Sequence, residues 1–547
     1  MSVVLLLTAT GCSTDSNDPD QAGGSARDQD SGGDQDSGGD EDSDAPAPLV
    51  PELNDAGPPV AVVDAVEPGA VSVGVSRQLF RTSPVVVVAQ AGDQAGVRDG
   101  AEQAAGLGVP LLLLDAAPAA AGDGASATSA PSDDASSTAP PDGAASTASA
   151  TVDATAQRAE IARLGAESVL AMGPQTGSAL GELADVEVVT AADDLPEVSP
   201  APAAAGLAVL LRRGTPAPAV ASATASAQAV GAEIIQVATQ DLRADPAAIE
   251  ALSGKPPARV LAVGPGFAPV DRLSGRLEVA ATGTLLPEGG QVLFPGRRLV
   301  ALYGHPGTPG LGVLGEQDLE ASIERAQEIA SDYDSLSSEP VVPAFEIIAT
   351  VAQASAGADG DYSFEESVEE LRPWVERAGE EGVYVVLDLQ PGRANFLDQA
   401  KIYEDLLRMP HVGLALDPEW RLTSTQRPLG QIGRVEAEEV NSVIDWLADL
   451  TAQEKLPQKL LVLHQFRLSM LQDTDEIELG RDQVQVLIHM DGQGAPHLKD
   501  DTWQAVTGAA PAGVPFGWKN FYDEDAPMLT PEQTMTREPT PLMISYQ

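Results

Sequence analysis

The chain has 547 residues, enough for two or three domains with separate hydrophobic cores. Its 82 acidic residues outnumber 31 Lys and Arg, giving a formal net charge of −51. Because phosphate binding needs Lys and Arg, this charge argues against nucleic acid as a partner. All five His, all five Trp and all seven Tyr lie at or beyond Tyr303. Imidazole and aromatic rings dominate binding sites, so we expect the C-terminal part to carry the function.

The first 12 residues resemble the end of an export signal. Val3–Leu7 is apolar but too short to span a bilayer, and the small residues Ala9, Thr10 and Gly11 stand directly before Cys12. This arrangement resembles the lipobox of bacterial lipoproteins. The resemblance implies acylation of Cys12, with palmitate-type chains that hold an exported protein on the extracytoplasmic face of the cell membrane. An incidental cysteine is the alternative, since Cys12 is the only Cys.

An acidic segment follows, and we assign residues 13–58 to a linker. Asp15–Asp44 is built mainly from Asp, Gly, Ser and Gln. Such a composition buries too little apolar surface to offset the entropy of ordering, so we predict disorder here. Calcium binding is an open alternative, although the Asp residues lack the ligand order of a known calcium loop.

Residues 59–295 contain an internal repeat. The segment 167–174, with sequence ESVLAMGP, is echoed by 258–265, with sequence ARVLAVGP. Apolar runs and helical segments recur around both copies, which predicts a Rossmann-like domain of two repeats with parallel sheets. The expected strands, besides those in the repeated segments, are Val85–Ala89, Val109–Leu114, Val186–Val189, Leu207–Leu211, Ile234–Val237 and Leu277–Ala280. The expected helices include Thr155–Leu164 and Ala221–Val230.

Three segments of this region carry a family resemblance. RTSPVVVVA at 81–89, GVPLLL at 108–113 and VLAMG at 169–173 resemble the cell-wall-binding repeat 2 family. The resemblance implies binding to anionic wall polymers, and members usually have three repeats where this chain shows two. Residues 116–151, rich in Ala, Ser, Thr and Pro, are expected to form a flexible insertion. Gly264-Pro265-Gly266 lacks a following Lys, so no nucleotide cofactor is expected.

Residues 296–547 show eight apolar runs, most of them separated by segments with helical spacing. This alternation predicts a closed parallel (β/α)8 barrel, also called a TIM barrel. The runs are Leu299–Tyr303, Val341–Ile348, Val383–Leu389, Val412–Leu416, Lys459–Phe466, Val484–Met490, Val514–Phe521 and Leu542–Tyr546. The expected helices include Leu319–Ala330, Val368–Ala378, Phe396–Arg408 and Ala437–Leu450.

Polar and charged residues stand where these runs end. Parallel strands bring their carboxyl ends to one rim, where barrels place their active sites. We therefore expect one cleft whose acids are partly neutralised by Lys519 or Arg393 and bridged by imidazoles. The expected cleft residues are His305, Glu346, Asp388, Asp417, Glu419, His464, His489 and Asp491.

The tetrapeptide Asp417-Pro418-Glu419-Trp420 resembles the D-x-E strand motif of muramidase-type glycoside hydrolases. The resemblance favours catalysis by Glu419 and Asp417 on a cell-wall glycan or other small carbohydrate, and Asp388, at the end of the preceding run, is a third catalytic candidate. Crowded acids shift one another's pKa values apart, which lets one act as a general acid. Trp420 and Trp518 are candidate platforms for sugar rings.

Other interpretations remain open. Asp417 could cap the following turn while Glu419 pairs with Arg421, and the domain could bind carbohydrate without catalysis. A metal-dependent hydrolase is a third possibility, because the His and Asp residues are suitable ligands for a zinc-like ion. The first strand lacks the His-x-His of such enzymes and the last offers only Ser545 and Tyr546, so no metal is expected. The barrel also resembles a domain of uncharacterised secreted actinobacterial-type lipoproteins with LYGHPG and FYDED segments, which implies no known activity.

Overall fold

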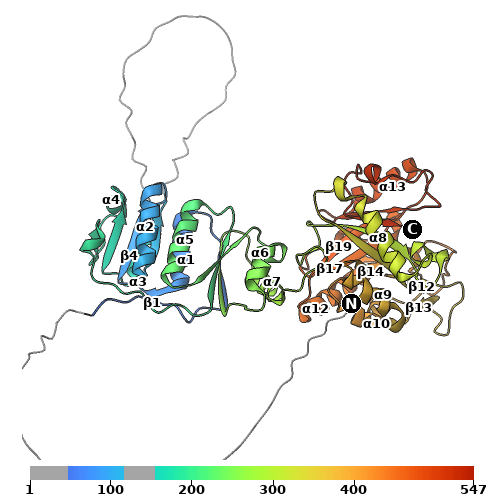
Figure 1. Ribbon diagram of the computed structural model, residues 1–547, viewed down its shortest axis with the longest axis horizontal. Coiled ribbons are helices and arrows are strands. Elements are labelled where there is room, and N and C mark those ends of the chain that lie inside the picture. The colour runs from blue at the N-terminus through green and yellow to red at the C-terminus, as the bar shows by residue number, and fades with distance from the viewer. Residues whose placement is uncertain (1–46, 116–153) are drawn as a thin grey trace, which may run out of the picture. The chain divides into compact units, whose positions relative to one another are not determined.

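A computed structural model describes residues 47–115 and 154–547 as a mixed α/β protein (Figure 1). The expected signal with Cys12, most of the acidic linker and the whole of the expected insertion lie outside the described residues. In the described part of the chain, no helix combines the length and apolarity needed to cross a membrane.

The first four-stranded sheet contains the first copy of the repeat. Its strands are all parallel and lie in the order β5-β4-β6-β7. They are β4 (Val85–Gln90), β5 (Leu111–Leu114), β6 (Ser168–Met172) and β7 (Glu187–Val189). The helices of this region are α2 (Gln94–Leu107), α3 (Thr155–Leu164) and α4 (Thr176–Leu180). Strands β4 and β5 are buried along nearly their whole length, as expected for continuous Val and Leu runs in a parallel sheet.

The second four-stranded sheet repeats the design. It has the parallel order β2-β10-β8-β9, and β2 enters it from before the first repeat. Its strands are β2 (Val60–Val63), β8 (Leu207–Arg212), β9 (Glu233–Val237) and β10 (Arg259–Val263). The helices are α1 (Pro68–Leu79), α5 (Ala217–Ala229), α6 (Pro246–Leu252) and α7 (Val270–Thr282), and a small antiparallel pair joins β1 (Glu52–Leu53) to β3 (Phe80–Thr82). The Rossmann-like organisation in two repeats is confirmed.

One expected strand of the second repeat is wrong. Leu277–Ala280 forms the C-terminal part of α7 instead of a strand. Leu273, Leu277 and Ala280 recur at helical spacing and are all buried on one face. The predicted strand was only four residues long, and a segment of that length cannot distinguish a strand from one turn of a helix.

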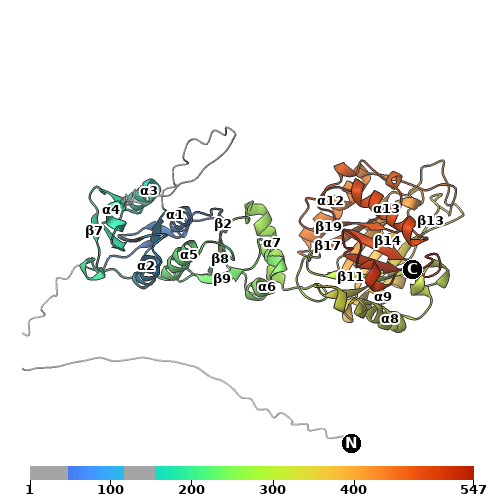
Figure 2. The same ribbon diagram turned by 90° about the horizontal axis from the view of Figure 1, so that it is seen from above.

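The C-terminal sheet closes on itself and confirms the (β/α)8 barrel (Figure 2). Eight strands follow one another around the barrel in chain order, all parallel, and the first pairs with both the second and the last. They are β11 (Arg298–Gly304), β12 (Val341–Ala352), β14 (Tyr384–Leu389), β15 (Val412–Leu416), β17 (Lys459–His464), β19 (Val484–Met490), β20 (Phe516–Asn520) and β21 (Met543–Tyr546).

The helices around the barrel are less regular than its strands. They are α8 (Leu319–Ser331), α9 (Val368–Glu380), α10 (Phe396–Ile402), α11 (Glu404–Leu407), α12 (Ala437–Gln453), α13 (Pro496–Ala509) and α14 (Pro531–Thr534). The single helix expected over Phe396–Arg408 is divided at Tyr403, whose buried hydroxyl donates to the carbonyl of Ala349. Between β17 and β19 the chain forms 3-10 turns and β18 (Leu471–Gln472), which pairs with β16 (Val435–Glu436).

An additional strand extends one side of the barrel. The pairing of β12 with β11 ends at Ile347, but β12 itself continues to Ala352. This extension pairs antiparallel with β13 (Ser363–Glu365). The connection between β12 and α9 therefore includes a short hairpin at the end of the barrel where the strands terminate.

The barrel interior changes from apolar to polar along the strands. Side chains on a strand alternate, so every second residue faces the interior. The inward apolar side chains form one hydrophobic cluster inside the barrel. The alternate side chains of the same strands point outward and pack against the surrounding helices in a second cluster. On most strands, the next inward residue toward the carboxyl end is polar, and these polar residues together form a layer above the apolar cluster. The series are Leu299-Ala301-Tyr303, Val342-Ala344-Glu346, Tyr384-Val386-Asp388, Leu460-Val462-His464, Leu487-His489-Asp491 and Met543-Ser545.

Candidate active site

A cavity of about 570 Å³ lies at the carboxyl ends of the barrel strands. It is lined by acids, a cation and aromatic rings contributed from most of the strand ends, which is where barrels of this class place their sites. The lining residues used below are Tyr303, Gln390, Asp417, Glu419, Trp420, Phe466, Asp491, Lys519 and Phe521. Glu346, Asp388, His464, His489 and Ser545 are fully buried in the polar layer of the barrel.

His464 at the end of β17 bridges two acids. Its Nε2 lies 2.8 Å from Glu346 Oε1 and its Nδ1 lies 2.9 Å from Asp491 Oδ2. Burial acts to lower the pKa of His464, but the two carboxylates outweigh burial and raise the pKa well above its usual value. The ring is therefore an imidazolium that donates through both nitrogens.

Asp388 and Tyr303 form a second pair in the polar layer. The Tyr303 hydroxyl donates to Asp388 Oδ2 at 3.0 Å, and Gln390 Nε2 donates to the same hydroxyl at 3.3 Å. Burial raises the pKa of Asp388 to about 6, with Glu346 adding to the shift while His464 and Lys519 oppose it. The Lys519 ammonium lies 3.3 Å from the centroid of the Tyr303 ring, a cation–π contact at the cavity wall.

Asp417 and Glu419 belong to a turn rather than to a strand. β15 ends at Leu416, and Pro418–Trp420 forms a 3-10 turn that Asp417 caps by accepting from the Glu419 amide at 3.3 Å. The two residues therefore do not lie on a strand, as the resemblance to a D-x-E strand motif implied, yet both line the cavity. The alternative pairing of Glu419 with Arg421 is not formed, because Arg421 instead binds Glu439 at 2.9 Å.

The carboxyl groups of Asp417 and Glu419 hold their protons more tightly than usual. Burial is the main cause for both. It raises the pKa of Asp417 well above its usual value, with Glu419 as the next contributor. It raises the pKa of Glu419 to about 7, with Asp491 as the next contributor and Lys519 and His464 opposing. A carboxylic acid that is partly protonated near neutral pH and lines a cavity can donate a proton to a ligand.

His489 is the neutral imidazole of the layer. Its Nε2 lies 2.8 Å from Ser545 Oγ, and its ring makes an edge contact with His464 at 5.3 Å between centroids. Burial, followed by the charge of His464, lowers the pKa of His489 well below its usual value. A Cβ at Gly517 would collide with the His489 ring, so the glycine makes room for it.

Three expected site residues are placed elsewhere. Trp518 faces the helix layer: it is fully buried against Trp503, and its indole donates to Asn520 Oδ1, so it offers no surface for a sugar. Arg393 donates to the carbonyl of Gln426 and stacks on Tyr362, so its guanidinium is held away from the acids. His305 binds Glu366 at 3.1 Å on the loop after β11 and does not line the cavity.

The candidate metal ligands do not converge on one point. Within residues 47–115 and 154–547, the group of three acids or imidazoles whose ligand atoms all lie within 4.8 Å of one another is Asp359, Asp361 and Glu365. These three belong to the hairpin between β12 and β13 and are partly exposed, and His305, His464, His489, Asp388 and Asp491 are not among them.

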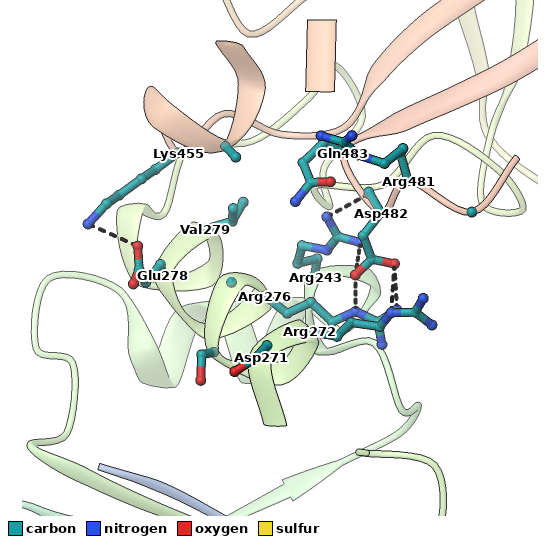
Figure 3. A pocket seen from close by; sticks show the side chains of 14 residues that line it. Arg243, Asp271, Arg272, Arg276, Glu278, Val279, Lys455, Arg481, Asp482 and Gln483 are labelled. Carbon is teal, nitrogen blue, oxygen red and sulfur yellow. Dashed lines mark hydrogen bonds and ion pairs between the residues drawn. The ribbon is translucent and has the colours of Figure 1, made fainter. Parts of the chain in front are cut away.

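A second cavity, of about 520 Å³, is lined by basic residues that already have partners (Figure 3). Asp482, just before β19, accepts from Arg276 Nε at 2.6 Å and lies 3.4 Å from Arg243 Nη2, while Lys455 lies 3.3 Å from Glu278. Burial raises the pKa of Asp482, but the arginines outweigh it and hold the pKa below its usual value. These charges are satisfied within the chain, so this cavity is a weaker candidate for a ligand site.

Comparisons with known proteins leave the family open. No family model matches the sequence, and no curated protein matches it. Among solved structures, the chain is similar to Cwp6 from Clostridium difficile, with 11% sequence identity and a TM-score of 0.28. The alignment covers 66% of this chain and 62% of Cwp6.

Proposed function

We propose that the barrel is a glycoside hydrolase-like enzyme that acts on a cell-wall glycan bound in the cavity at the strand ends. The observation that carries this proposal is the cavity-lining Glu419, whose pKa is raised to about 7 by burial and by the charge of Asp491. Glycoside hydrolysis requires an acid of raised pKa beside a carboxylate that stays ionised. Trp420, in the same turn as Glu419, lines the cavity and offers a flat surface for a sugar ring.

The test is the release of reducing ends from a panel of purified wall glycans by the isolated protein. We expect measurable turnover on at least one member of the panel. Absence of turnover across the whole panel, measured from acidic to weakly alkaline pH, would count against an enzyme.

Binding without catalysis is the second candidate, and the observation that favours it is the partly exposed Trp420 at the cavity. Trp420→Ala should weaken retention on glycan resin by about ten-fold, because the variant loses the stacking and apolar contact between the indole ring and the bound sugar. The partly buried Trp446 of α12 is a matched control, since it packs against the barrel core and does not line the cavity. Equal retention by the Trp420→Ala and Trp446→Ala variants would remove Trp420 from the site.

We also propose export and lipid anchoring through Cys12, with residues 59–295 as a wall-binding region and residues 296–547 as the barrel domain. The support is the lipobox-like sequence before Cys12 and the cell-wall-binding resemblance. Cys12→Ala should move the protein from the membrane fraction to the medium, or block its maturation, because stable anchoring needs the acyl chains. Unchanged membrane fractionation of the variant would contradict the anchor.

A further inference from the structure

We propose that the free carboxylate oxygen of Asp491 receives positive charge on the bound sugar and that His464, backed by Glu346, is the positioning residue that holds Asp491 in place. This inference deepens the proposed function and rests on the same cavity. It replaces Asp388, a further catalytic candidate that the sequence had placed at the end of a neighbouring apolar run.

The geometry around Asp491 is that of a carboxylate held by one oxygen and unpaired at the other. Asp491 lines the cavity and its side chain is 9% exposed. Its Oδ2 binds His464 Nδ1 at 2.9 Å, and Glu346 Oε1 fixes the opposite ring nitrogen at 2.8 Å. Among the described residues, Asp491 Oδ1 is buried and has no hydrogen-bond partner. An unpaired buried carboxylate oxygen is costly, so a bound group that pairs with it gains that free energy.

Asp388 is less suited to this role. Its Oδ2 accepts from the Tyr303 hydroxyl and its Oδ1 is also buried without a hydrogen-bond partner in the described part of the chain, but unlike Asp491 the residue does not line the cavity. Its pKa is raised to about 6, chiefly by burial. For Asp491, burial also raises the pKa, but the charge and hydrogen bond of His464 outweigh it and hold the pKa below its usual value. Near neutral pH, Asp491 is therefore ionised while Glu419 is partly protonated. Two carboxyl groups whose pKa values are shifted apart in this way can take opposite roles, one as acid and one as stabilising anion.

The inference gives each carboxyl group a place in the reaction. Glu419 gives its proton to the glycosidic oxygen while the bond from that oxygen to the anomeric carbon breaks, and the bonding electron pair stays on the oxygen. Positive charge develops on the sugar ring, and ionised Asp491 stabilises it. A water molecule then forms the new bond to the anomeric carbon and loses a proton to Glu419, which restores the acid.

The same chemistry can be supplied by a stable ligand. A sugar that carries a protonated nitrogen in its ring, or a free amine beside the ring, places a positive charge near the position of the developing charge. The cavity should therefore prefer a basic sugar analogue to a neutral analogue of the same shape.

The experiment compares basic iminosugars of glucose and N-acetylglucosamine configuration with their neutral lactams, using calorimetry on the full protein at pH 7. We expect the wild-type protein to bind an iminosugar at least about ten-fold more tightly than its lactam. Asp491→Asn should remove this preference and leave lactam binding within about three-fold. Asp501→Asn, an exposed residue of α13, serves as the matched control. Glucosamine against N-acetylglucosamine shows whether an amine outside the ring is also accepted.

Each outcome is decisive. Loss of the preference in Asp491→Asn but not in Asp501→Asn supports the inference. Equal binding of iminosugar and lactam by the wild-type protein overturns it, and this arm needs no variant to fold. A preference that survives in Asp491→Asn also overturns it. Glycan turnover without the preference would defeat this inference alone, whereas an Asp491-dependent preference without turnover would defeat the hydrolase proposal alone.

The positioning role of His464 has a separate readout. His464→Gln keeps a hydrogen-bond donor for Asp491 but removes the positive charge. We expect this variant to retain iminosugar binding at high pH, where Asp491 ionises without help, and to lose it, as the pH is lowered, at a higher pH than the wild-type protein does. A pH dependence identical to that of the wild-type protein would show that His464 is a packing residue only.

Discussion

Replacing Glu419 by glutamine should lower kcat on a responsive wall glycan by about two to four orders of magnitude, the usual contribution of a general acid. Glutamine keeps the shape of the side chain but has no carboxyl proton to give to the leaving oxygen. Because the pKa of Glu419 is raised to about 7, the wild-type residue is protonated in a large part of the population at neutral pH. The measurement is initial rate against glycan concentration for both proteins.

The control for this substitution is Glu438→Gln, at an exposed position in the first turn of α12. We expect that variant to keep the wild-type kcat. Binding should survive in Glu419→Gln, because removing an interaction made only in the transition state lowers kcat and leaves ground-state affinity nearly unchanged. A kcat for Glu419→Gln within about two-fold of the wild-type value would exclude Glu419 as the acid.

The second large effect is on stability. His464→Ala should lower the free energy of unfolding of the barrel by about 3–5 kcal/mol, the usual cost of leaving a buried charge without its partner. Glu346 and Asp491 both bind the fully buried His464 ring, so its removal leaves two acids facing one another in the barrel. Urea unfolding followed by tryptophan fluorescence reports on the barrel, because all five Trp lie between Trp374 and Trp518.

This stability has a defined pH dependence. The pKa of His464 is raised in the folded protein, since Glu346 and Asp491 together outweigh burial. Its contribution is therefore fully present below the unfolded pKa of about 6.5 and is lost as pH rises through the folded pKa. The difference between wild type and His464→Ala should shrink toward alkaline pH. His497→Ala, at an exposed position, is the control, and an equal effect of the two substitutions would contradict the charge bridge.

The barrel could be predicted because its strands carry two independent signals. The apolar runs gave the strand positions, and five of them, such as Val412–Leu416 and Val484–Met490, match the strands to within one residue at both ends. The change from apolar to polar residues along each inward series located the site at the carboxyl ends. Tyr303 could have been assigned to the site as well, since it continues the series of Leu299 and Ala301.

The direction of a side chain was harder to predict than the position of its strand. Trp518 and Lys519 are neighbours on β20 and face opposite sides, but Gly517 gives no hydrophobic signal that would fix which side is inward. Arg393 lies in a loop, where no periodicity applies, and its partners Gln426 and Tyr362 are distant in sequence.

The pairing within the polar layer also lay beyond the sequence. His464 joins Glu346 and Asp491, two residues from strands on different sides of it, and this choice depends on how the closed barrel directs each side chain. Several acids and two imidazoles of similar chemistry end neighbouring strands, so the sequence allows many pairings. The neighbours then decide the charge states: Glu346 and Asp491 raise the pKa of His464 against burial, whereas burial and the charge of His464 lower the pKa of His489.

The pH dependence of kcat on a responsive glycan tests the central claim most directly. We expect a bell-shaped profile whose alkaline limb falls with an apparent pKa near 7, since Glu419, with a pKa raised to about 7, must be protonated to act. The acidic limb should fall where Asp491, whose pKa is held low by His464, becomes protonated. A rate that stays constant from pH 5 to pH 9, about two units to either side of neutrality, would contradict acid catalysis by Glu419.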